Sequence, residues 1–335
     1  MFDLIYVEEA VRDHPRARAI LGRYPRASVV PCERYGEVFN RRAQNFRLQK
    51  RRPALILAAK FDHFVLEAPA GYGIGHERNF YFSHMLNCVY GCRYCFLQGL
   101  YGSAHLVLFV NYKDFQSAIE TAIAAAAGRS ACFFSGYDCD SLALEPLSGF
   151  VEHLLPFIAR HPAACFELRT KSAQIRPLAH AEPLSNCVVA YSLSPGPVAE
   201  ELEAGAPPLE SRLAAMEALA ERGWPLGLRF DPVLLRPDFE AEYSRLFAEV
   251  FDRIPTDRIH SVSLGAFRLP RENFKRVSRL YPEVRLFAEE IEESDGMVSY
   301  RSGRCEELLE FCTREIVRRV SPEVFFPCHA LAGSR

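Results

Sequence analysis

Residues 83–98 read Ser83-His-Met-Leu-Asn-Cys88-Val-Tyr-Gly-Cys92-Arg-Tyr-Cys95-Phe-Leu-Gln98. The C-x3-C-x2-C spacing lets three thiolates surround one metal centre if the loop is open. Thiolates are the usual ligands of iron–sulfur clusters, and three of them leave one iron of a [4Fe–4S] cluster free for another ligand. A structural zinc site usually has a second cysteine or histidine pair, and the sequence shows none beside this triplet. Cys88, Cys92 and Cys95 therefore predict an iron–sulfur cluster.

Short apolar runs alternate with amphipathic segments after this triplet. The runs that we interpret as strands are 106–110, 131–134, 165–168, 188–191, 226–230 and 262–264. The segments of helical length between them include 115–127, 142–159, 209–222 and 243–253. Such alternation indicates βαβ units around a parallel sheet. We expect an α/β fold, either a partial or full (β/α) barrel or an open doubly wound sheet. In both, the catalytic groups belong at the C-terminal ends of the strands.

The chain of 335 residues is long for one compact domain and short for three. We expect a basic N-terminal region of helical or mixed structure at 1–78, a core at 79–265 and a C-terminal extension at 266–335 with a helix at 305–320. Residues 1–60 carry 13 Lys/Arg against 6 Asp/Glu, although the whole chain has a net charge of −2. This asymmetry suggests an anionic partner such as nucleic acid, but an ordinary solvated basic surface also explains it.

The apolar runs are too short to cross a bilayer, so we expect no membrane partner. The N-terminus carries acidic residues early and lacks the basic start of a secretory signal, which favours a cytoplasmic location. In such a location, 11 cysteines suggest metal binding or redox chemistry for some of them. The cysteines that show no ligand spacing, and that we expect to be buried thiols, are Cys32, Cys132, Cys165, Cys187, Cys305, Cys312 and Cys328.

The cysteine triplet, with the aromatic Tyr94 before its last cysteine, resembles the signature of radical S-adenosylmethionine (SAM) enzymes. A narrower resemblance, to the spore photoproduct lyase family and mostly to its members outside spore formers, rests on residues 81–99, 133–145, 168–172, 223–232 and 263–269. It implies a partial (β/α)6-type radical SAM barrel with N-terminal and C-terminal extensions. It also implies a [4Fe–4S] cluster on the triplet and SAM as cofactors, which together supply the radical chemistry.

Members of this family reverse a UV lesion in which a methylene bridge joins two adjacent thymines. The resemblance implies a radical SAM lyase for DNA repair, in which a 5′-deoxyadenosyl radical takes hydrogen from the lesion, the bridge breaks, and a protein residue returns hydrogen. The implied partners are DNA carrying a thymine photoproduct, flipped out of its duplex, and an electron donor such as flavodoxin or ferredoxin. Two alternatives stay open. One is a radical SAM enzyme acting on another lesion or a non-DNA substrate, and the other is a non-catalytic iron–sulfur or zinc protein for binding or sensing.

The residues expected to bind SAM are Tyr94, Asp138, Lys171, Ser192, Ser194 and Arg229. By resemblance, Lys171 lies near the SAM carboxylate, where a charge-assisted contact is favourable. Tyr94 packs near the adenine and also matches a relay tyrosine of the family. Arg229 and Asp231 stand at the end of a buried strand, where unpaired charges are costly. We expect one of these two residues to face the SAM pocket, with mutual pairing as the alternative.

The hydrogen donor is the main departure from the family pattern. Tyr137 stands where the spore enzymes carry the donor cysteine, and Cys139 lies two residues further along. Three hypotheses follow: Cys139 is a shifted donor, Tyr137 is the donor, or the substrate differs. Phe96 stands where those enzymes have a second relay tyrosine, and it has no hydroxyl group to contribute.

Two further positions come from the same comparison of patterns. Tyr300 matches a residue of the segment that contacts the lesion, and Arg301 is the second candidate there because Ser299 stands where an arginine is expected. His84, four residues before the first cysteine of the triplet, is expected to have a structural role, such as packing on the cluster loop.

Overall fold

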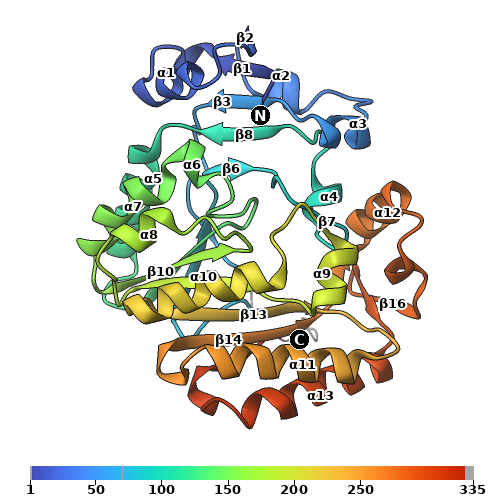
Figure 1. The fold of residues 1–335 in the computed structure, drawn as a ribbon. Helices are drawn as coiled ribbons and strands as arrows, with labels where there is room; N and C mark the ends of the chain where they lie inside the picture. The colour runs from blue at the N-terminus through green and yellow to red at the C-terminus, as the bar shows by residue number, and fades with distance from the viewer. Residues whose placement is uncertain (1, 70, 329–335) are drawn as a thin grey trace.

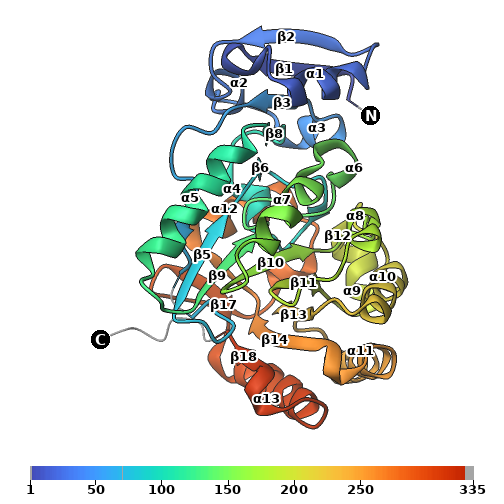
Figure 2. The same ribbon diagram turned by 90° about the vertical axis from the view of Figure 1, so that its left-hand side faces the viewer.

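The computed structural model describes residues 2–69 and 71–328. Its larger sheet has the strand order β18-β14-β13-β11-β10-β9-β5-β4. The strands are β4 (Leu66–Glu67), β5 (Arg78–Phe82), β9 (Ala131–Ser135), β10 (Ala164–Thr170), β11 (Cys187–Ser192), β13 (Leu226–Val233), β14 (Ile259–Ala266) and β18 (Phe325–Pro327). All neighbouring pairs from β5 to β18 are parallel. The sheet curls into a half-barrel (Figure 2), which confirms the partial (β/α)6-type fold.

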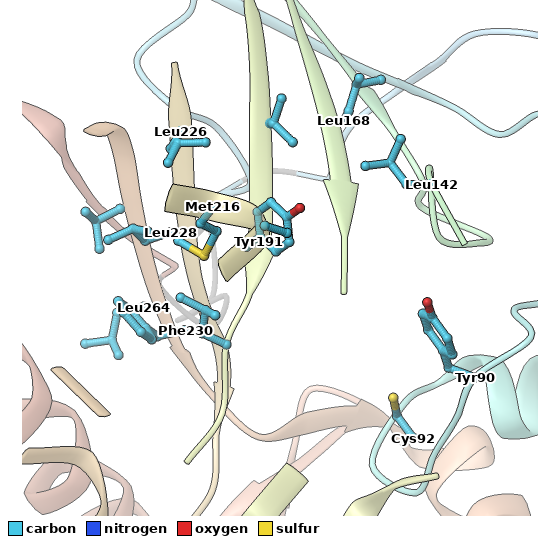
Figure 3. Packing of buried hydrophobic residues seen from close by; sticks show 14 of the residues in the cluster. Tyr90, Cys92, Leu142, Leu168, Tyr191, Met216, Leu226, Leu228, Phe230 and Leu264 are labelled. Atoms are coloured by element: carbon cyan, nitrogen blue, oxygen red, sulfur yellow. The ribbon is translucent and has the colours of Figure 1, made fainter. Parts of the chain in front are cut away.

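Amphipathic helices cover the outer face of this sheet. They are α5 (Tyr112–Ala125), α7 (Phe150–Ala159), α8 (Arg176–His180), α10 (Leu209–Arg222), α11 (Phe239–Arg253) and α13 (Ser302–Val317). The short helix α6 (Glu145–Ser148) instead places Leu147 in the apolar cluster of the N-terminal strands. Met216 of α10 lies beside Tyr191 and Leu228 of the sheet in one large apolar cluster (Figure 3). The predicted helix at 142–159 is divided by Gly149, which has a left-handed φ of 54°. Burial of the helices' apolar faces is what fixes them to the strands.

A second sheet lies at one end of the molecule, at the top of Figure 1. Its order is β2-β1-β3-β8-β6. The strands are β1 (Leu4–Glu8), β2 (Ser28–Cys32), β3 (Leu55–Ala58), β6 (Met85–Leu86) and β8 (Leu106–Phe109). The expectation that 106–110 is a strand of the core sheet is therefore wrong, because β8 pairs with β3 and β6, and β5 occupies the first place in the half-barrel. A fully buried apolar run does not reveal which sheet it joins.

The N-terminal region has mixed structure. Its helices are α1 (Pro15–Gly22), α2 (Gly36–Phe39) and α3 (Phe46–Arg51). The side chain of Asn45 accepts a hydrogen bond from the backbone N–H of Leu48 and so caps α3. Because β6 and β8 belong to the same sheet as β1 to β3, the expected boundary at residue 78 does not coincide with an edge of this sheet.

The C-terminal residues add a small antiparallel sheet and two helices. The elements are β15 (Arg268–Pro270), α12 (Arg271–Leu280), β16 (Ile291–Ser294), β17 (Met297–Tyr300) and α13, which corresponds to the helix expected at 305–320. The 3-10 helices are Glu9–Val11, Thr256–Arg258, Arg285–Ala288 and Pro322–Val324. Among the helices of the described residues, none has both the length and the apolar character needed to cross a membrane.

Candidate active site

The loop that carries the cysteine triplet follows β5 at the carboxyl edge of the sheet. Asn87, which precedes Cys88, adopts a left-handed φ of 68°. Its side-chain amide donates to the carbonyl oxygens of Ser103 and His105, both at 2.8 Å. Asparagine tolerates the left-handed region better than most residues, so this contact fixes the turn that leads into the first cysteine.

Three elements hold the loop from different sides. Lys50 of α3 donates from Nζ to the carbonyl oxygens of Cys88 at 2.6 Å and Tyr90 at 2.9 Å. The two-residue strand β7 (Gly91–Cys92) pairs antiparallel with β12 (Glu203–Ala204). A third contact is made by α4 (Leu97–Leu100), which packs against α12 so closely that a Cβ atom on Gly99 would lie 2.9 Å from Val277 Cγ2. The loop is therefore fixed by its backbone, which leaves the thiols free for other contacts.

The three thiols of the loop are close enough to share one metal centre. Each thiol of Cys88, Cys92 and Cys95 interacts electrostatically with at least one of the others. Three thiolates are a ligand set suited to an iron–sulfur cluster with one iron open to another ligand. Burial raises the pKa of Cys88 to about 12, and the charge of Lys50 opposes this shift. Deprotonation of these thiols is thus coupled to metal binding.

Glu203 joins the SAM-binding candidates into one buried group beside the loop. Its carboxylate accepts from Ser194 Oγ at 2.9 Å and from the Tyr94 hydroxyl, and it pairs with Lys171 Nζ at 3.1 Å and with Arg212. Burial opposes ionisation of Glu203, but the two cations and the Tyr94 hydroxyl outweigh it and lower its pKa to about 2. Glu203 follows helix α9 (Gly196–Leu202), and its Cα pairs in register with that of Cys92.

Asp140 fixes the backbone from which Lys171 extends. Its carboxylate accepts from the backbone N–H of Lys171 at 2.7 Å and from Thr170 Oγ1 at 2.7 Å. It also accepts from the N–H groups of Leu142 and Ala143 at 3.0 and 2.9 Å. Burial raises the pKa of Asp140, although these four hydrogen bonds favour the charged form. The loop after β9 and the end of β10 are therefore held together on the site side of the sheet.

Tyr137 and Cys139 lie in different surroundings. The Tyr137 ring stacks on Tyr81, with centroids 4.3 Å apart, and its centroid is 5.5 Å from that of Phe96. Cys139 is 6% exposed and belongs to an apolar cluster shared with the N-terminal sheet. Its Sγ lies 3.9 Å from Nδ1 of His84. Both side chains therefore lie beside the cluster loop: Tyr137 next to Phe96 at its end, and the Cys139 thiol between His84 and the N-terminal sheet, within electrostatic range of Cys88.

His84 has the packing environment expected of a structural residue. Its ring stacks on Phe150, with centroids 3.8 Å apart and planes within 1°. Burial lowers the pKa of His84 to about 3, so the ring is neutral.

Asp138 donates its backbone N–H to Ser83 Oγ at 3.1 Å, and burial raises the pKa of its carboxyl group. Asp138 thus lies in the loop after β9, and its expected contact with SAM stays a prediction.

Arg229 and Asp231 do not pair with each other. Arg229 is buried and donates to Glu167 at 2.7 Å and to Ser261 Oγ at 2.8 Å. Each of its three donor nitrogens has an acceptor in the protein, so the geometry does not support the expected contact with SAM. Asp231 pairs with Arg268 at 3.0 Å. Arg229 is therefore neutralised by Glu167, and Asp231 by Arg268, and not by each other.

Tyr300 and Arg301, the expected lesion contacts, lie in different surroundings. Tyr300 is 1% exposed, and its hydroxyl accepts the backbone N–H of Leu235 at 2.9 Å. Arg301 is exposed and lies 3.6 Å from Glu290. Alternation along β17 turns Tyr300 into the core, so a direct contact with the lesion stays a prediction that only Arg301 meets by exposure. Ser192 is half-buried at the end of β11, at the carboxyl edge, as expected.

Sequence reasoning missed Lys50, Glu203 and Asp140. Asp140 stood within a segment that resembled the family, and a buried acid at a strand end was a usable signal. Lys50 and Glu203 lie far from the triplet along the chain, in segments whose composition gave no sign of a contact with it.

Comparison with known proteins gives a consistent result. A family model described as spore photoproduct lyase matches residues 80–306. The spore photoproduct lyase of Bacillus subtilis (strain 168) is 22% identical over 209 residues, which cover 61% of this chain and 60% of that protein. The spore photoproduct lyase of Geobacillus sp. (strain Y412MC61) is 22% identical over 220 residues, which cover 65% of this chain and 63% of the relative. The matches thus span less than two thirds of the curated relatives' length.

Solved structures show the same fold. A spore photoproduct lyase mutant with bound AdoMet and dinucleoside spore photoproduct has a TM-score of 0.85, 18% identity and 98% coverage of both chains. Another spore photoproduct lyase, complexed with dinucleoside spore photoproduct, has a TM-score of 0.83, 17% identity and the same coverage. A half-barrel with a three-cysteine loop at the carboxyl edge of its strands defines the radical SAM class of proteins. Within that class, the chain belongs to the spore photoproduct lyase family.

Proposed function

We propose that this protein is a radical SAM lyase that repairs a UV-induced thymine photoproduct in DNA. The observation that carries the proposal is the position of the triplet Cys88, Cys92 and Cys95 beside the buried Glu203 group, in a chain of this family. A reduced [4Fe–4S] cluster with bound SAM supplies a 5′-deoxyadenosyl radical. The family match and both curated relatives are lyases, so neither alternative from the sequence is favoured.

The Glu203 group provides charges suited to SAM. Lys171 is held at one carboxylate oxygen of Glu203, and its ammonium group can meet the SAM carboxylate as well. Arg212 neutralises the other side of Glu203, which keeps the carboxylate ionised without consuming Lys171. Tyr94 and Ser194 are oriented by the same carboxylate. We assign SAM binding to Lys171, Tyr94 and Ser194, with Glu203 as the positioning residue.

The aromatic group of Tyr81, Tyr137 and Phe96 provides a surface for a base. Stacking on aromatic rings binds unpaired bases without a requirement for sequence, and a damaged base leaves its duplex at low cost. Tyr137 is half-buried and carries a hydroxyl group, so it can return a hydrogen atom to a thymine radical and itself become a tyrosyl radical. We assign the hydrogen donor to Tyr137.

A repair assay tests the function directly. Reduced protein with a reconstituted cluster is incubated anaerobically with SAM and a dinucleoside spore photoproduct, and the products are separated by chromatography. We expect repaired thymines, and no SAM cleavage in Cys92→Ala. SAM cleavage without repair would reject the substrate and keep the radical SAM assignment. A second assay arm with labelled SAM and other candidate substrates would then identify the molecule that loses hydrogen to deoxyadenosine.

A basic pocket behind the cluster loop is the proposed docking site of the electron donor. This pocket of about 200 Å³ is lined by Arg47, Lys50, Arg51, Arg93 and three uncharged residues. Lys50 contacts the backbone of Cys88 directly, so a carrier at this pocket would be close to the loop. Complementary charge steers such encounters. We propose that an acidic flavodoxin or ferredoxin docks here.

We also propose a cytoplasmic location, because the free cysteines fit a reducing environment.

A further inference from the structure

Two core cysteines and a histidine converge inside the half-barrel, away from the cluster loop. One ligand atom each from His76, Cys132 and Cys165 lies within 4.8 Å of the other two, and these residues form the single such group found among the described His, Cys, Asp and Glu residues. Cys132 is 0% exposed, Cys165 is 6% exposed and His76 is half-buried. All three residues are outside the proposed active site.

The strand register explains why the two thiols meet. Cys132 of β9 and Cys165 of β10 are direct partners in the parallel ladder, and Asn79 of β5 is the partner of Cys132 on its other side. Partner residues on adjacent strands point to the same face of a sheet. The cysteines pack with Ile74 in an apolar cluster that is separate from the one under the helices. His76 reaches them from the segment before β5, and its carbonyl accepts from Asn79 Nδ2 at 2.8 Å.

A second histidine supplies an independent sign of a missing ligand. The pairing of β13 with β14 shifts register between Leu226–Ile259 and Gly227–Ser261, so His260 is the extra residue of a bulge. Bulges often redirect a side chain. Nδ1 of His260 is buried and has no hydrogen-bond partner within the described parts of the chain. His260 also lies within electrostatic range of His76. Such unpartnered buried atoms are rare without a ligand or a water.

We propose that His76, Cys132 and Cys165 bind a Zn²⁺ ion, with His260, which lies outside the group within 4.8 Å and would have to turn toward the ion, as the candidate fourth ligand. Thiolate and imidazole together are a ligand set that zinc prefers, and zinc accepts four ligands in a tetrahedron. Ligands at about 2.0 to 2.3 Å from one ion are roughly 4 Å apart, and the observed limit of 4.8 Å is compatible with this spacing.

The zinc site would have a structural role. Cys132 is three residues from Ser135 at the carboxyl end of β9, so the site lies about 10 Å from the edge that carries the chemistry. An ion there would join the segment before β5 to β9 and β10. Since β5 leads directly into the cluster loop, the ion would stabilise the base from which that loop extends. A structural zinc site contributes its binding free energy to folding.

A cavity lies next to the segment that carries His76, and an ion could approach the proposed site from it. It has a volume of about 490 Å³ and is lined by Gly75 and Glu77, the chain neighbours of His76, and by Asn79 and Phe326. Phe326 belongs to β18, and β4 is at the other edge of the sheet, so the cavity lies where the two edges of the half-barrel approach each other. Its wall carries Glu67, Glu77 and Arg78, and the resulting excess of one negative charge favours a cation.

The experiment measures zinc in the full-length protein with its iron–sulfur cluster in place. Protein is loaded with one equivalent of Zn²⁺, treated with a moderate chelator and analysed for zinc and iron. Zinc K-edge absorption then identifies the ligands without interference from iron. We expect about one zinc per chain, bound to two sulfurs and at least one nitrogen. His76→Ala should lower zinc retention at least tenfold with unchanged iron, and Cys165→Ala should abolish it.

Matched variants separate this site from general damage. Cys187→Ala removes another buried thiol, on the neighbouring strand but in the apolar cluster under the helices, and His180→Ala removes an exposed imidazole. Both should retain zinc as the wild type does. His76 is half-buried and outside a strand, so its variant tests the site even if Cys165→Ala does not fold. No retained zinc, zinc bound to three sulfurs, equal retention in His76→Ala, or a disulfide between Cys132 and Cys165 by mass spectrometry would overturn the proposal.

Discussion

The Nζ atom of Lys50 lies 2.6 Å from the carbonyl oxygen of Cys88, although 38 residues separate the two along the chain. Lys50 belongs to α3 in the basic N-terminal region, and Cys88 is the first cysteine of the cluster loop. The basic region therefore takes part in building the proposed active site. Its positive charge also lies next to the backbone of a loop that would hold an anionic thiolate cluster.

Lys50→Met should weaken retention of the cluster. The substitution keeps most of the side-chain volume but leaves the carbonyl oxygens of Cys88 and Tyr90 without their donor, at a cost of about 1–3 kcal/mol for each buried group. We expect less iron per chain after reconstitution and faster bleaching of the cluster absorbance in the presence of a chelator. Arg52→Met, at an exposed position, is the control. Equal bleaching rates in Lys50→Met and wild type would contradict the supporting role of Lys50.

Glu203→Gln should change how stability depends on pH. The pKa of Glu203 is about 2 in the folded protein, below its ordinary value of 4.5. The folded state thus binds this proton more weakly than the unfolded state. The resulting stabilisation, about 3 kcal/mol, is complete above pH 4.5 and is lost as the pH falls toward 2. The variant should have a lower melting temperature at pH 7 and a smaller further loss on acidification than wild type.

Thermal melts from pH 7 to pH 3 measure this difference, with Glu290→Gln as an exposed control. SAM affinity is the second measurement, because Lys171 and Tyr94 lose the carboxylate that orients them. Parallel pH profiles for Glu203→Gln and wild type would show that Glu203 is not the acid-sensitive group.

Tyr137→Phe and Cys139→Ala should affect repair differently. The Tyr137 ring lies beside Tyr81 and Phe96, whereas the Cys139 thiol faces His84 within an apolar cluster. We expect Tyr137→Phe to reduce thymine formation at least tenfold while SAM cleavage continues, because the phenolic hydrogen is missing. Cys139→Ala should retain repair within about threefold. The opposite ranking would make Cys139, which lies within electrostatic range of Cys88, the donor.

Charge reversal at Arg47 and Arg51 should slow only the reaction that depends on a protein reductant. Both side chains are exposed and line the basic pocket near the cluster loop. We expect Arg47→Glu with Arg51→Glu to lower SAM cleavage at least tenfold with reduced flavodoxin at low salt, and to leave cleavage with dithionite unchanged. Loss of activity with both reductants would indicate damage to the loop, and no loss with either would place the docking surface elsewhere.

The sequence predicted the half-barrel and its cluster loop because both depend on local patterns. Parallel strands appear as buried apolar runs, and the ligand spacing of the triplet lies within one loop. The assignment of 106–110 to the wrong sheet has the same origin, since an apolar run is equally suited to either sheet. The resemblance to spore photoproduct lyases identified the family from motifs that lie mostly within the matched residues 80–306.

Contacts between distant segments could not be predicted. Glu203 meets Cys92 through a two-residue pairing, and Cys132 meets Cys165 through strand register, neither of which leaves a spacing signal. Tyr300 was placed by resemblance alone, which does not reveal that its hydroxyl accepts a backbone N–H in the core. In each case the contact depends on how strands and helices align in three dimensions. That alignment could not be predicted from the pattern of a single sequence.

Strand β8 prevents the half-barrel from being produced without the N-terminal sheet. The chain leaves the half-barrel after the cluster loop, contributes β8 to the N-terminal sheet, and returns through α5. A truncated protein that began near residue 78 would lack β3 and expose one long side of a fully buried apolar strand. Such an open edge invites pairing between molecules. Shortened versions of this protein should therefore precipitate, and fusion partners are better attached at the termini than inserted between the sheets.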